Sequence, residues 1–167
     1  MASNISVTLP DGSKREYQKG ATCMDVAISI SEGLARVVVA ANADGKIVDL
    51  SYPLEKDCSF KLLKAEDKEG LEVFRHSSAH LLANAVIELF PDAKLTIGPV
   101  VEEGFYYDID HSPFSPEDIE KIEKKMQEIV DKKVDIKKRV LTKKEALGLF
   151  KNNEYKLEII NDIPAGE

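Results

Sequence analysis

Two of the chain's three histidines, His76 and His80, stand four residues apart. In a helix, residues at this spacing lie on one face about one turn apart, so the two imidazoles would be neighbours. Such a pair can bind Zn²⁺ if other protein ligands complete the site, or it can transfer protons and bind substrate, because imidazole titrates near neutral pH. It can also be two ordinary, half-exposed histidines. The spacing leaves these three alternatives open, because short motifs often occur by chance.

The segment around the pair has the pattern of an amphipathic helix. Apolar or small residues recur at spacings of three and four, and Pro91 ends the run, because the residue before a proline avoids the helical conformation. The recurring positions are Leu71, Phe74, Ser78, Leu81, Leu82, Ala85 and Leu89. The histidines fall beside this stripe, which suits a polar cluster facing a cleft.

The residues after this helix predict a β-hairpin. Residues 95–101 and 105–110 are rich in β-branched and aromatic residues, as strands are. Strand alternation places Phe105 and Tyr107 on one face. Gly98 interrupts the first strand, and glycine inside a strand pattern often marks a place where another group approaches the backbone closely.

The rest of the second half predicts a packing helix and smaller elements. The patterns indicate a helix over 115–131, a strand over 134–140, a short helix opened by Thr142 and a strand over 155–160. In the last strand, alternation places Lys156 on the face opposite its neighbours, where it can reach a cleft. His111 lies in a loop with no partner in sequence, so we expect it to be exposed.

The first 64 residues predict a small α+β module. Their order is a hairpin over 5–9 and 14–17, a helix from Thr22 to Gly33, a strand over 37–41 that pairs with 46–50, and a strand over 59–63. This is the order of a β-grasp fold, a sheet wrapped on one helix. The polar run 65–70 is the expected domain boundary, which gives domains over 1–64 and 65–167.

Composition places the chain among globular proteins of the reducing cytoplasm. Of its 167 residues, 43% are apolar and 32% are charged, and no apolar run approaches the roughly 20 residues of a membrane span. No export signal is visible, and the two cysteines, Cys23 and Cys58, are too few for a disulfide framework. We interpret both as small buried residues, and we expect no membrane partner.

The net charge of −7 argues against a nucleic-acid partner, but one segment of the chain is basic although the whole chain is acidic. Seven basic residues stand against one acid, Asp135: Lys132, Lys133, Lys137, Lys138, Arg139, Lys143 and Lys144. A solvated surface explains such a run, and so does a track for phosphates. The run is therefore a candidate contact for an RNA backbone, centred on Lys137, Lys138 and Arg139.

Three segments in order resemble the editing region of bacterial-type threonyl-tRNA synthetases. They are residues 75–82, with both histidines; residues 97–100, Ile-Gly-Pro-Val; and residues 104–108, Gly-Phe-Tyr-Tyr-Asp. Residues 8–13 and 24–27 resemble the TGS domain that opens the same enzymes. The resemblance covers essentially the whole chain. It implies an α+β fold, a small β-grasp, TGS-like domain followed by an incomplete α+β editing domain. The related editing domain of alanyl-tRNA synthetases shares the two-histidine helix but normally lacks this β-grasp module.

The resemblance implies hydrolytic proofreading of serine wrongly esterified to the tRNA of threonine. Serine differs from threonine by one methyl group, which a binding pocket discriminates only about 10- to 200-fold. By match to the family's positions, His76, His80 and Lys156 are the expected catalytic residues. Tyr107 is expected near the substrate, with Gly98 beside it. We expect the imidazoles to position the ribose or the water, and Lys156 to stabilise charge or polarise the water.

The resemblance also defines what we expect to be missing. The family completes this site with a later Cys-x-x-x-His element, and no such element occurs by Glu167, so we expect a fragment with little hydrolytic activity alone. ATP, magnesium and zinc belong to the family's catalytic core, so we expect no cofactor or metal in these residues. The expected partner is the acceptor end of tRNA(Thr) in the full enzyme. That enzyme would dimerise through its core, and we expect the fragment to be a monomer.

Two other functions remain open from the sequence. One is a free-standing RNA-binding or regulatory module without catalysis, supported by the basic run. The other is a metal-dependent hydrolase that uses His76 and His80. Stoichiometric zinc in the purified protein would favour the latter.

Overall fold

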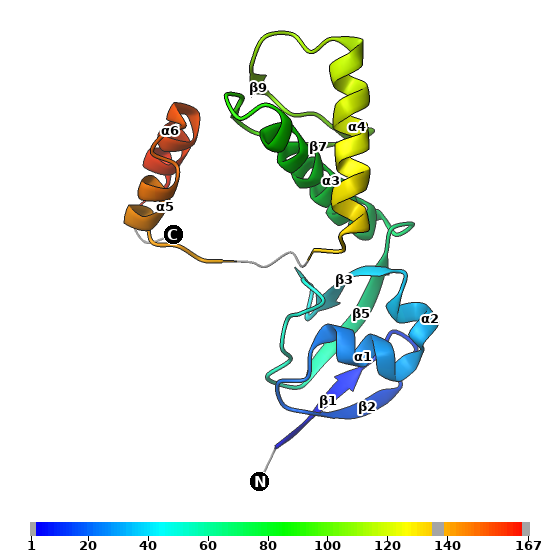
Figure 1. Cartoon of the computed structure of the whole chain (residues 1–167). Coiled ribbons are helices and arrows are strands. Elements are labelled where there is room, and N and C mark those ends of the chain that lie inside the picture. The colour runs from blue at the N-terminus through cyan, green and yellow to red at the C-terminus, as the bar shows by residue number, and fades with distance from the viewer. Residues whose placement is uncertain (1–2, 135–138, 165–167) are drawn as a thin grey trace. The chain divides into compact units, whose positions relative to one another are not determined.

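The computed structural model describes residues 3–134 and 139–164. The chain divides into two compact units, Met1–Arg75 and His76–Glu167, and the fold is α+β (Figure 1). Helix α3 (Lys68–Leu89) runs across this division, with its first turns in the first unit. Each unit has its own hydrophobic core.

The first unit is a five-stranded mixed sheet with helix α1 across one face (Figure 1). The strands are β1 (Asn4–Thr8), β2 (Lys14–Gln18), β3 (Val38–Ala43), β4 (Lys46–Val48) and β5 (Cys58–Lys64), in the order β2-β1-β5-β3-β4. β1 runs parallel to β5, and the other neighbouring pairs are antiparallel. This arrangement confirms the predicted β-grasp fold.

Strand alternation and one helix face build the core of the first unit. In β1, Ile5 and Val7 point inward and are 4% and 0% exposed, while Ser6 between them is more accessible. Val26 of α1 and Leu63 of β5 are also fully buried. Burial of one such aliphatic side chain contributes about 1.5–3 kcal/mol. Cys23 and Cys58 are buried and unpaired, as predicted.

Helix α1 (Cys23–Ile30) begins where the sequence predicts. The Thr22 hydroxyl accepts from the Asp25 N–H, and the Asp25 carboxylate accepts from the Thr22 N–H, a capping box. The predicted end at Gly33 is wrong. Ser31 adopts extended backbone after Ile30, and its hydroxyl accepts from the N–H of Gly33, so a second short helix, α2 (Glu32–Ala35), starts there.

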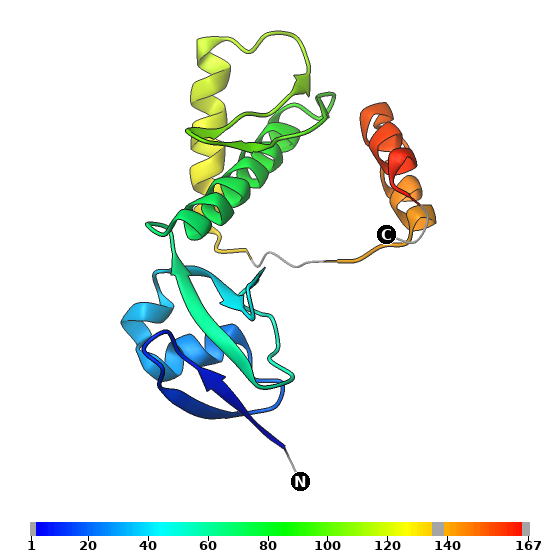
Figure 2. The same cartoon turned by 180° about the vertical axis from the view of Figure 1, so that it is seen from behind.

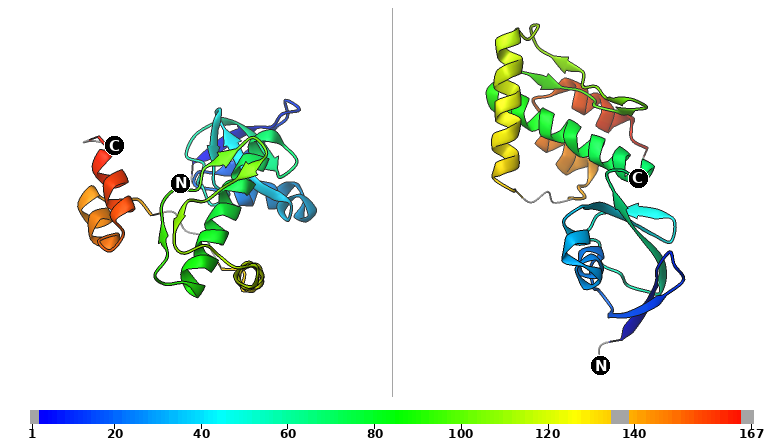
Figure 3. Two further views of the ribbon diagram at one scale, coloured as in Figure 1. Left: turned by 90° about the horizontal axis from the view of Figure 1, so that it is seen from above. Right: turned by 90° about the vertical axis from the view of Figure 1, so that its right-hand side faces the viewer.

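The second unit packs an irregular hairpin and helix α4 (Pro116–Asp131) on α3, as Figures 2 and 3 show from several sides. The hairpin consists of two short pairs: β6 (Lys94–Leu95) with β9 (Ile109–Asp110), and β7 (Val100–Val101) with β8 (Gly104–Phe105). Between them, the Thr96 N–H donates to the Asp108 carbonyl at 3.0 Å. The predicted hairpin is therefore confirmed, with a break in its middle.

Helices α3 and α4 share the core of the second unit. Ala85 and Val86 of α3 are fully buried, and they belong to one cluster with Ile122 and Ile129 of α4. Ser115 caps α4 with a capping box, and Pro116 takes the first helical position, as predicted. The core therefore fixes the face of α3 that the histidines flank.

Two short helices follow, α5 (Lys143–Leu149) and α6 (Glu154–Asp162). α5 starts at the Thr142 cap as predicted, but the strand predicted over 155–160 is wrong. Asn153 caps a helix there, with its side chain accepting from the Lys156 N–H, and Ile160 is the buried residue on the inner face. The strand predicted over 134–140 falls largely on residues 135–138, outside the described residues.

Candidate catalytic site

The two histidines of α3 are neighbours. Their ring centroids are 4.7 Å apart with planes tilted by 51°, and both residues remain accessible to solvent. Ala79, directly before His80, is 2% exposed and Ala83 is 7% exposed, so the core stripe of α3 runs beside the imidazoles. The pair thus lies at the border between core and solvent, where the helical spacing places it.

The pKa of His80 is lowered from its ordinary value of 6.5. Partial burial is the main cause, because desolvation disfavours the charged imidazolium. The neighbouring His76 and the ammonium of Lys156 lower it further. The lowered pKa of His80 favours the neutral imidazole, the form that can accept a proton, and Lys156 lies close enough for its charge to act on this ring.

Lys156 reaches this site from a helix. It lies in the first turn of α6, and its Nζ donates to the Thr96 carbonyl oxygen at 2.5 Å. The side chain is half-buried, and burial lowers the pKa of its amine. The predicted strand alternation therefore does not explain the orientation of Lys156, because residues 154–162 form a helix. In helix α6, Lys156 and Leu157 are both partly buried. Lys156 precedes the buried Ile160 by four residues, so the two lie on the same face of the helix.

Tyr107 and Gly98 are packed against each other across the hairpin. A Cβ on Gly98 would come within 2.3 Å of Tyr107 Cδ2, so only glycine leaves room for this ring. The group that approaches the Gly98 backbone is therefore Tyr107 itself. The ring also packs against the core of the second unit, and burial raises the pKa of its hydroxyl. Because Gly98 has no side chain, the Tyr107 ring can pack directly on its backbone.

His111 is not simply exposed, as the sequence had indicated. Its ring stacks on Phe114 at 4.8 Å between centroids and lies 5.1 Å from Phe90, so it belongs to an aromatic cluster. Its Nδ1 lies 2.7 Å from the Ser112 carbonyl oxygen. A histidine with several apolar neighbours in space cannot be recognised from a loop sequence alone.

Only part of the basic run lies within the residues that the structure describes. Lys137 and Lys138 lie outside the described residues, and Arg139 is exposed. Lys143 has a structural role, because its Nζ donates to the carbonyl oxygens of Asn161 and Ile163 at 2.9 and 3.1 Å. These bonds satisfy carbonyls at the end of α6. Lys143 is thus a weaker candidate for phosphate contact than Arg139.

The arrangement can support proton transfer and charge stabilisation. A neutral imidazole can accept a proton from water, and Lys156 carries three N–H donors, of which Thr96 uses one. Over residues 3–134 and 139–164, no three His, Cys, Asp or Glu side chains gather as metal ligands would. Within the same ranges, none of the helices is both long and apolar enough to span a lipid bilayer.

Comparison with known proteins identifies the first unit. The family of TGS domains matches residues 5–64, which cover the five-stranded sheet and helices α1 and α2. Residues 5–64 are a TGS domain.

Nearly the whole chain, TGS domain included, is similar to part of the threonine--tRNA ligases. The ligase of Hyphomonas neptunium is 54% identical over 98% of this chain and 25% of its own length. Those of Polaromonas sp. and Acetivibrio thermocellus are 51% and 49% identical over 98% of the chain and 26% of their own lengths. The chain corresponds to the N-terminal region of these ligases and spans about a quarter of their length.

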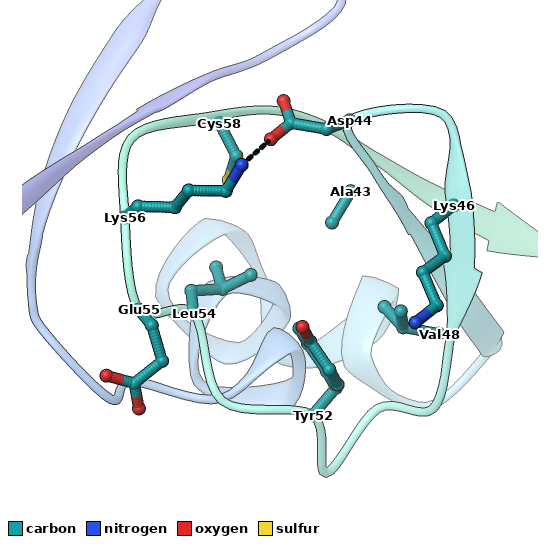
Figure 4. Close-up of a pocket in the computed structure, with 9 residues that line it drawn as sticks. All are labelled: Ala43, Asp44, Lys46, Val48, Tyr52, Leu54, Glu55, Lys56 and Cys58. Atoms are coloured by element: carbon teal, nitrogen blue, oxygen red, sulfur yellow. Dashed lines mark ion pairs between the residues drawn. The ribbon is translucent and has the colours of Figure 1, made fainter. Parts of the chain in front are cut away.

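The TGS domain also contains a pocket that the sequence did not indicate. It has a volume of about 350 Å³ and opens between β3, β4 and the loop that leads into β5 (Figure 4). Leu54 and Cys58 line the pocket with apolar side chains, and Tyr52 also lines it. Lys56 pairs with Asp44 at 3.3 Å on the rim. The pocket therefore lies between the loop that leads into β5 and the edge of the sheet formed by β3 and β4.

Two residues of the candidate site were not predicted from the sequence. Thr96 contributes its backbone carbonyl, which any residue type could supply, so no sequence signal marks it. Asn153 holds the start of α6, and its signal was present: asparagine before an acidic residue is a common helix start. The alternation in residues 155–160 favoured a strand and masked it.

Proposed function

We propose that the second unit is the proofreading region of a threonine--tRNA ligase, and that residues 65–167 contribute to it. The proposed reaction removes serine wrongly esterified to tRNA(Thr). The observation that carries the proposal is the convergence of the His76–His80 pair with Lys156, which reaches the pair from a different helix. The names of the relatives, threonine--tRNA ligases, support the choice of substrate.

The chemistry is hydrolysis of an ester between an aminoacyl group and a ribose hydroxyl. A water oxygen attacks the carbonyl carbon and gives its proton to a base, for which neutral His80 is suited. Negative charge grows on the carbonyl oxygen, and the ammonium of Lys156 has free N–H donors to stabilise it. The carbon–oxygen ester bond then breaks, and the ribose oxygen takes up a proton. Free serine and intact tRNA result.

The roles of the other site residues follow from position. His76 lies against His80 and is suited to hold the ribose or the water. Tyr107 presents a phenol fixed by Gly98 and by the core, which suits a wall for the aminoacyl group. A wall of this kind can exclude the extra methyl group of threonine, so that this site admits only the smaller serine, which a first binding pocket rejects poorly.

The test is deacylation of seryl-tRNA(Thr), measured with the purified chain and with a threonine--tRNA ligase that carries it as N-terminal region. His76→Ala and Lys156→Ala are each expected to lower the rate by about 10²-fold or more, as is usual when a base or charge-stabilising donor is removed. Lys151→Ala is the matched control, because Lys151 is an exposed lysine in the loop before α6. Wild-type rates in His76→Ala and Lys156→Ala would refute these roles.

We further propose that Lys137, Lys138 and Arg139 contact phosphates of the tRNA. Arg139 is exposed and lies in a run with few acids, which supports this role. Each phosphate contact releases counterions, so replacement of one basic residue by alanine should reduce the slope of log affinity against log salt by about one. Arg139→Ala is compared with Lys151→Ala in a binding titration with tRNA. An unchanged slope would remove the arginine from the contact.

A further inference from the structure

The first turn of α6 is attached to the β6–β9 strand pair through four consecutive residues. The Asn153 amide donates to the Leu95 carbonyl oxygen at 2.9 Å, and Lys156 Nζ donates to the next carbonyl along the same chain, that of Thr96. Lys94 pairs with Glu154 at 2.6 Å, and the Tyr155 hydroxyl donates to the Asp110 carboxylate at 3.0 Å. The start of this helix is thereby fixed against the hairpin that also carries Gly98 and Tyr107.

Asn153 differs from the other three because one side chain makes two separate connections. Its Nδ2 donates to β6, and its Oδ1 accepts from the backbone N–H of Lys156 at 3.1 Å. A single amide therefore links the strand to the residue that carries the ammonium. Aspartate, serine or threonine could cap the helix equally well, but only an amide of this length both caps it and donates to Leu95.

Burial makes the Asn153 bonds the more effective ones. Both are partly shielded from solvent, and Leu95 is only 6% exposed. The Lys94–Glu154 ion pair and the Tyr155–Asp110 hydrogen bond are both exposed. An exposed ion pair contributes little because water and salt screen it, and water competes for an exposed hydrogen bond. Asn153 is thus the main polar connection between α6 and the strand pair, apart from Lys156 itself.

We propose that Asn153 is a positioning residue: by linking Leu95 to the backbone of Lys156, it holds the Lys156 ammonium beside the histidine pair. The inference rests on the proposed function, since it assigns Asn153 a role in the same site. This role requires no contact between Asn153 and the reacting atoms. It acts through Lys156, whose Nζ it keeps within reach of the Thr96 carbonyl.

Asn153→Ser is the informative variant, because serine can still cap α6 but is too short to reach the Leu95 carbonyl. In the threonine--tRNA ligase that carries this chain as its N-terminal region, we expect kcat for seryl-tRNA deacylation to fall about 10- to 100-fold with little change in KM. A small misplacement of a catalytic group lowers the rate of the chemical step. Thr142→Ser is the matched control. It exchanges one cap for another in α5 and leaves the α6 connection intact.

A second measurement does not depend on activity. Lys156 lowers the pKa of His80 in the folded chain, so NMR titration of the His80 ring reports where the ammonium lies. In Asn153→Ser the pKa of His80 should rise toward 6.5, while Thr142→Ser should leave it unchanged. An unchanged His80 titration and an unchanged kcat would overturn the proposal. A raised His80 pKa in Asn153→Ser, together with failure of a complete threonine--tRNA ligase that carries this chain as its N-terminal region to deacylate seryl-tRNA, would support the positioning role and refute the proposed function.

Discussion

The ring of Tyr107 lies directly over the α-carbon of Gly98, at a distance that leaves no room for a methyl group between them. A Cβ at Gly98 would come within 2.3 Å of Cδ2 and 2.5 Å of Cε2 of the ring. Both residues belong to the broken middle of the hairpin, where the strands do not form regular pairs. Backbone hydrogen bonds flank the two residues, from the Asp108 N–H to the Ile97 carbonyl and from the Tyr106 N–H to the Pro99 carbonyl. The packing of the ring on Gly98 between these bonds sets the direction in which the phenol points.

Gly98→Ala is therefore expected to displace Tyr107 and destabilise the second unit. Overpacking of this kind typically costs about 1–3 kcal/mol, because the ring must leave its position or the backbone must shift. Urea unfolding measures the free-energy change. Seryl-tRNA deacylation should fall in parallel if Tyr107 forms the wall of the substrate site.

Two further variants test the cause of this effect. Gly104→Ala, in the same hairpin, is the control: nothing lies within 4 Å of a Cβ there, so little change is expected. In a Tyr107→Ala background, which removes the clashing atoms, Gly98→Ala should cost much less than in the wild type. Equal costs in the two backgrounds would show that the clash is not the cause.

Short-range patterns predicted most elements of this chain, because those elements depend on neighbours in sequence. The α3 helix and its histidine spacing followed from the periodicity of apolar residues, and the capping boxes at Thr22, Ser115 and Thr142 located three helix starts. The individual strands of the TGS domain followed from strand and turn signals. These features could be predicted because one or two turns of chain determine them.

The sequence failed where two local signals conflicted or where distant residues meet. Residues 155–160 alternate like a strand, yet the Asn153 cap and contacts with β6 make them helical. The bond from Lys156 to the Thr96 carbonyl joins residues 60 positions apart, and a backbone carbonyl has no residue-type signal. The side chains of the candidate site could thus be named from the family resemblance, but the contacts that hold them could not.

Gly70 should be intolerant of alanine for a different reason from Gly98. It lies in the first turn of α3, and a Cβ there would come within 1.9 Å of the Lys64 carbonyl oxygen at the end of β5. The neighbour is backbone, held by the bond from the Asp67 N–H to the same carbonyl, so it cannot turn away as a side chain can. We expect Gly70→Ala to cost more than the usual range of about 1–3 kcal/mol for overpacking.

Gly148→Ala is the matched control for Gly70→Ala. Gly148 lies in α5, and nothing lies within 4 Å of a Cβ at that position. Alanine should stabilise this helix by up to about 1 kcal/mol, because glycine is a poor helix former. The melting temperature should therefore fall in Gly70→Ala and rise in Gly148→Ala. A stable Gly70→Ala protein would show that the β5–α3 connection can rearrange.

The lowered pKa of His80 predicts how stability depends on pH. The unfolded chain takes up a proton at this residue near pH 6.5, and the folded chain does so only at lower pH, because burial and the charges of His76 and Lys156 oppose it. The unfolded state then binds more protons, so His80 makes stability fall as pH decreases below 6.5. Urea unfolding at pH 7.5 and 5.5 measures this loss, and it should be smaller in His80→Gln. An equal loss in both proteins would assign it to other groups.

The two cysteines should differ in their reaction with thiol reagents. Burial raises the pKa of Cys23 to about 11, and its side chain is fully inaccessible, so almost no thiolate is available at pH 8. Cys58 also has a raised pKa but lines the pocket of the TGS domain and is 8% exposed (Figure 4). A small alkylating reagent should therefore modify Cys58 first, and Cys23 only when the domain opens. Mass spectrometry of digested samples gives the order, and both should react at once in urea. Equal rates in the folded protein would show that the TGS core opens faster than the reagent enters the pocket.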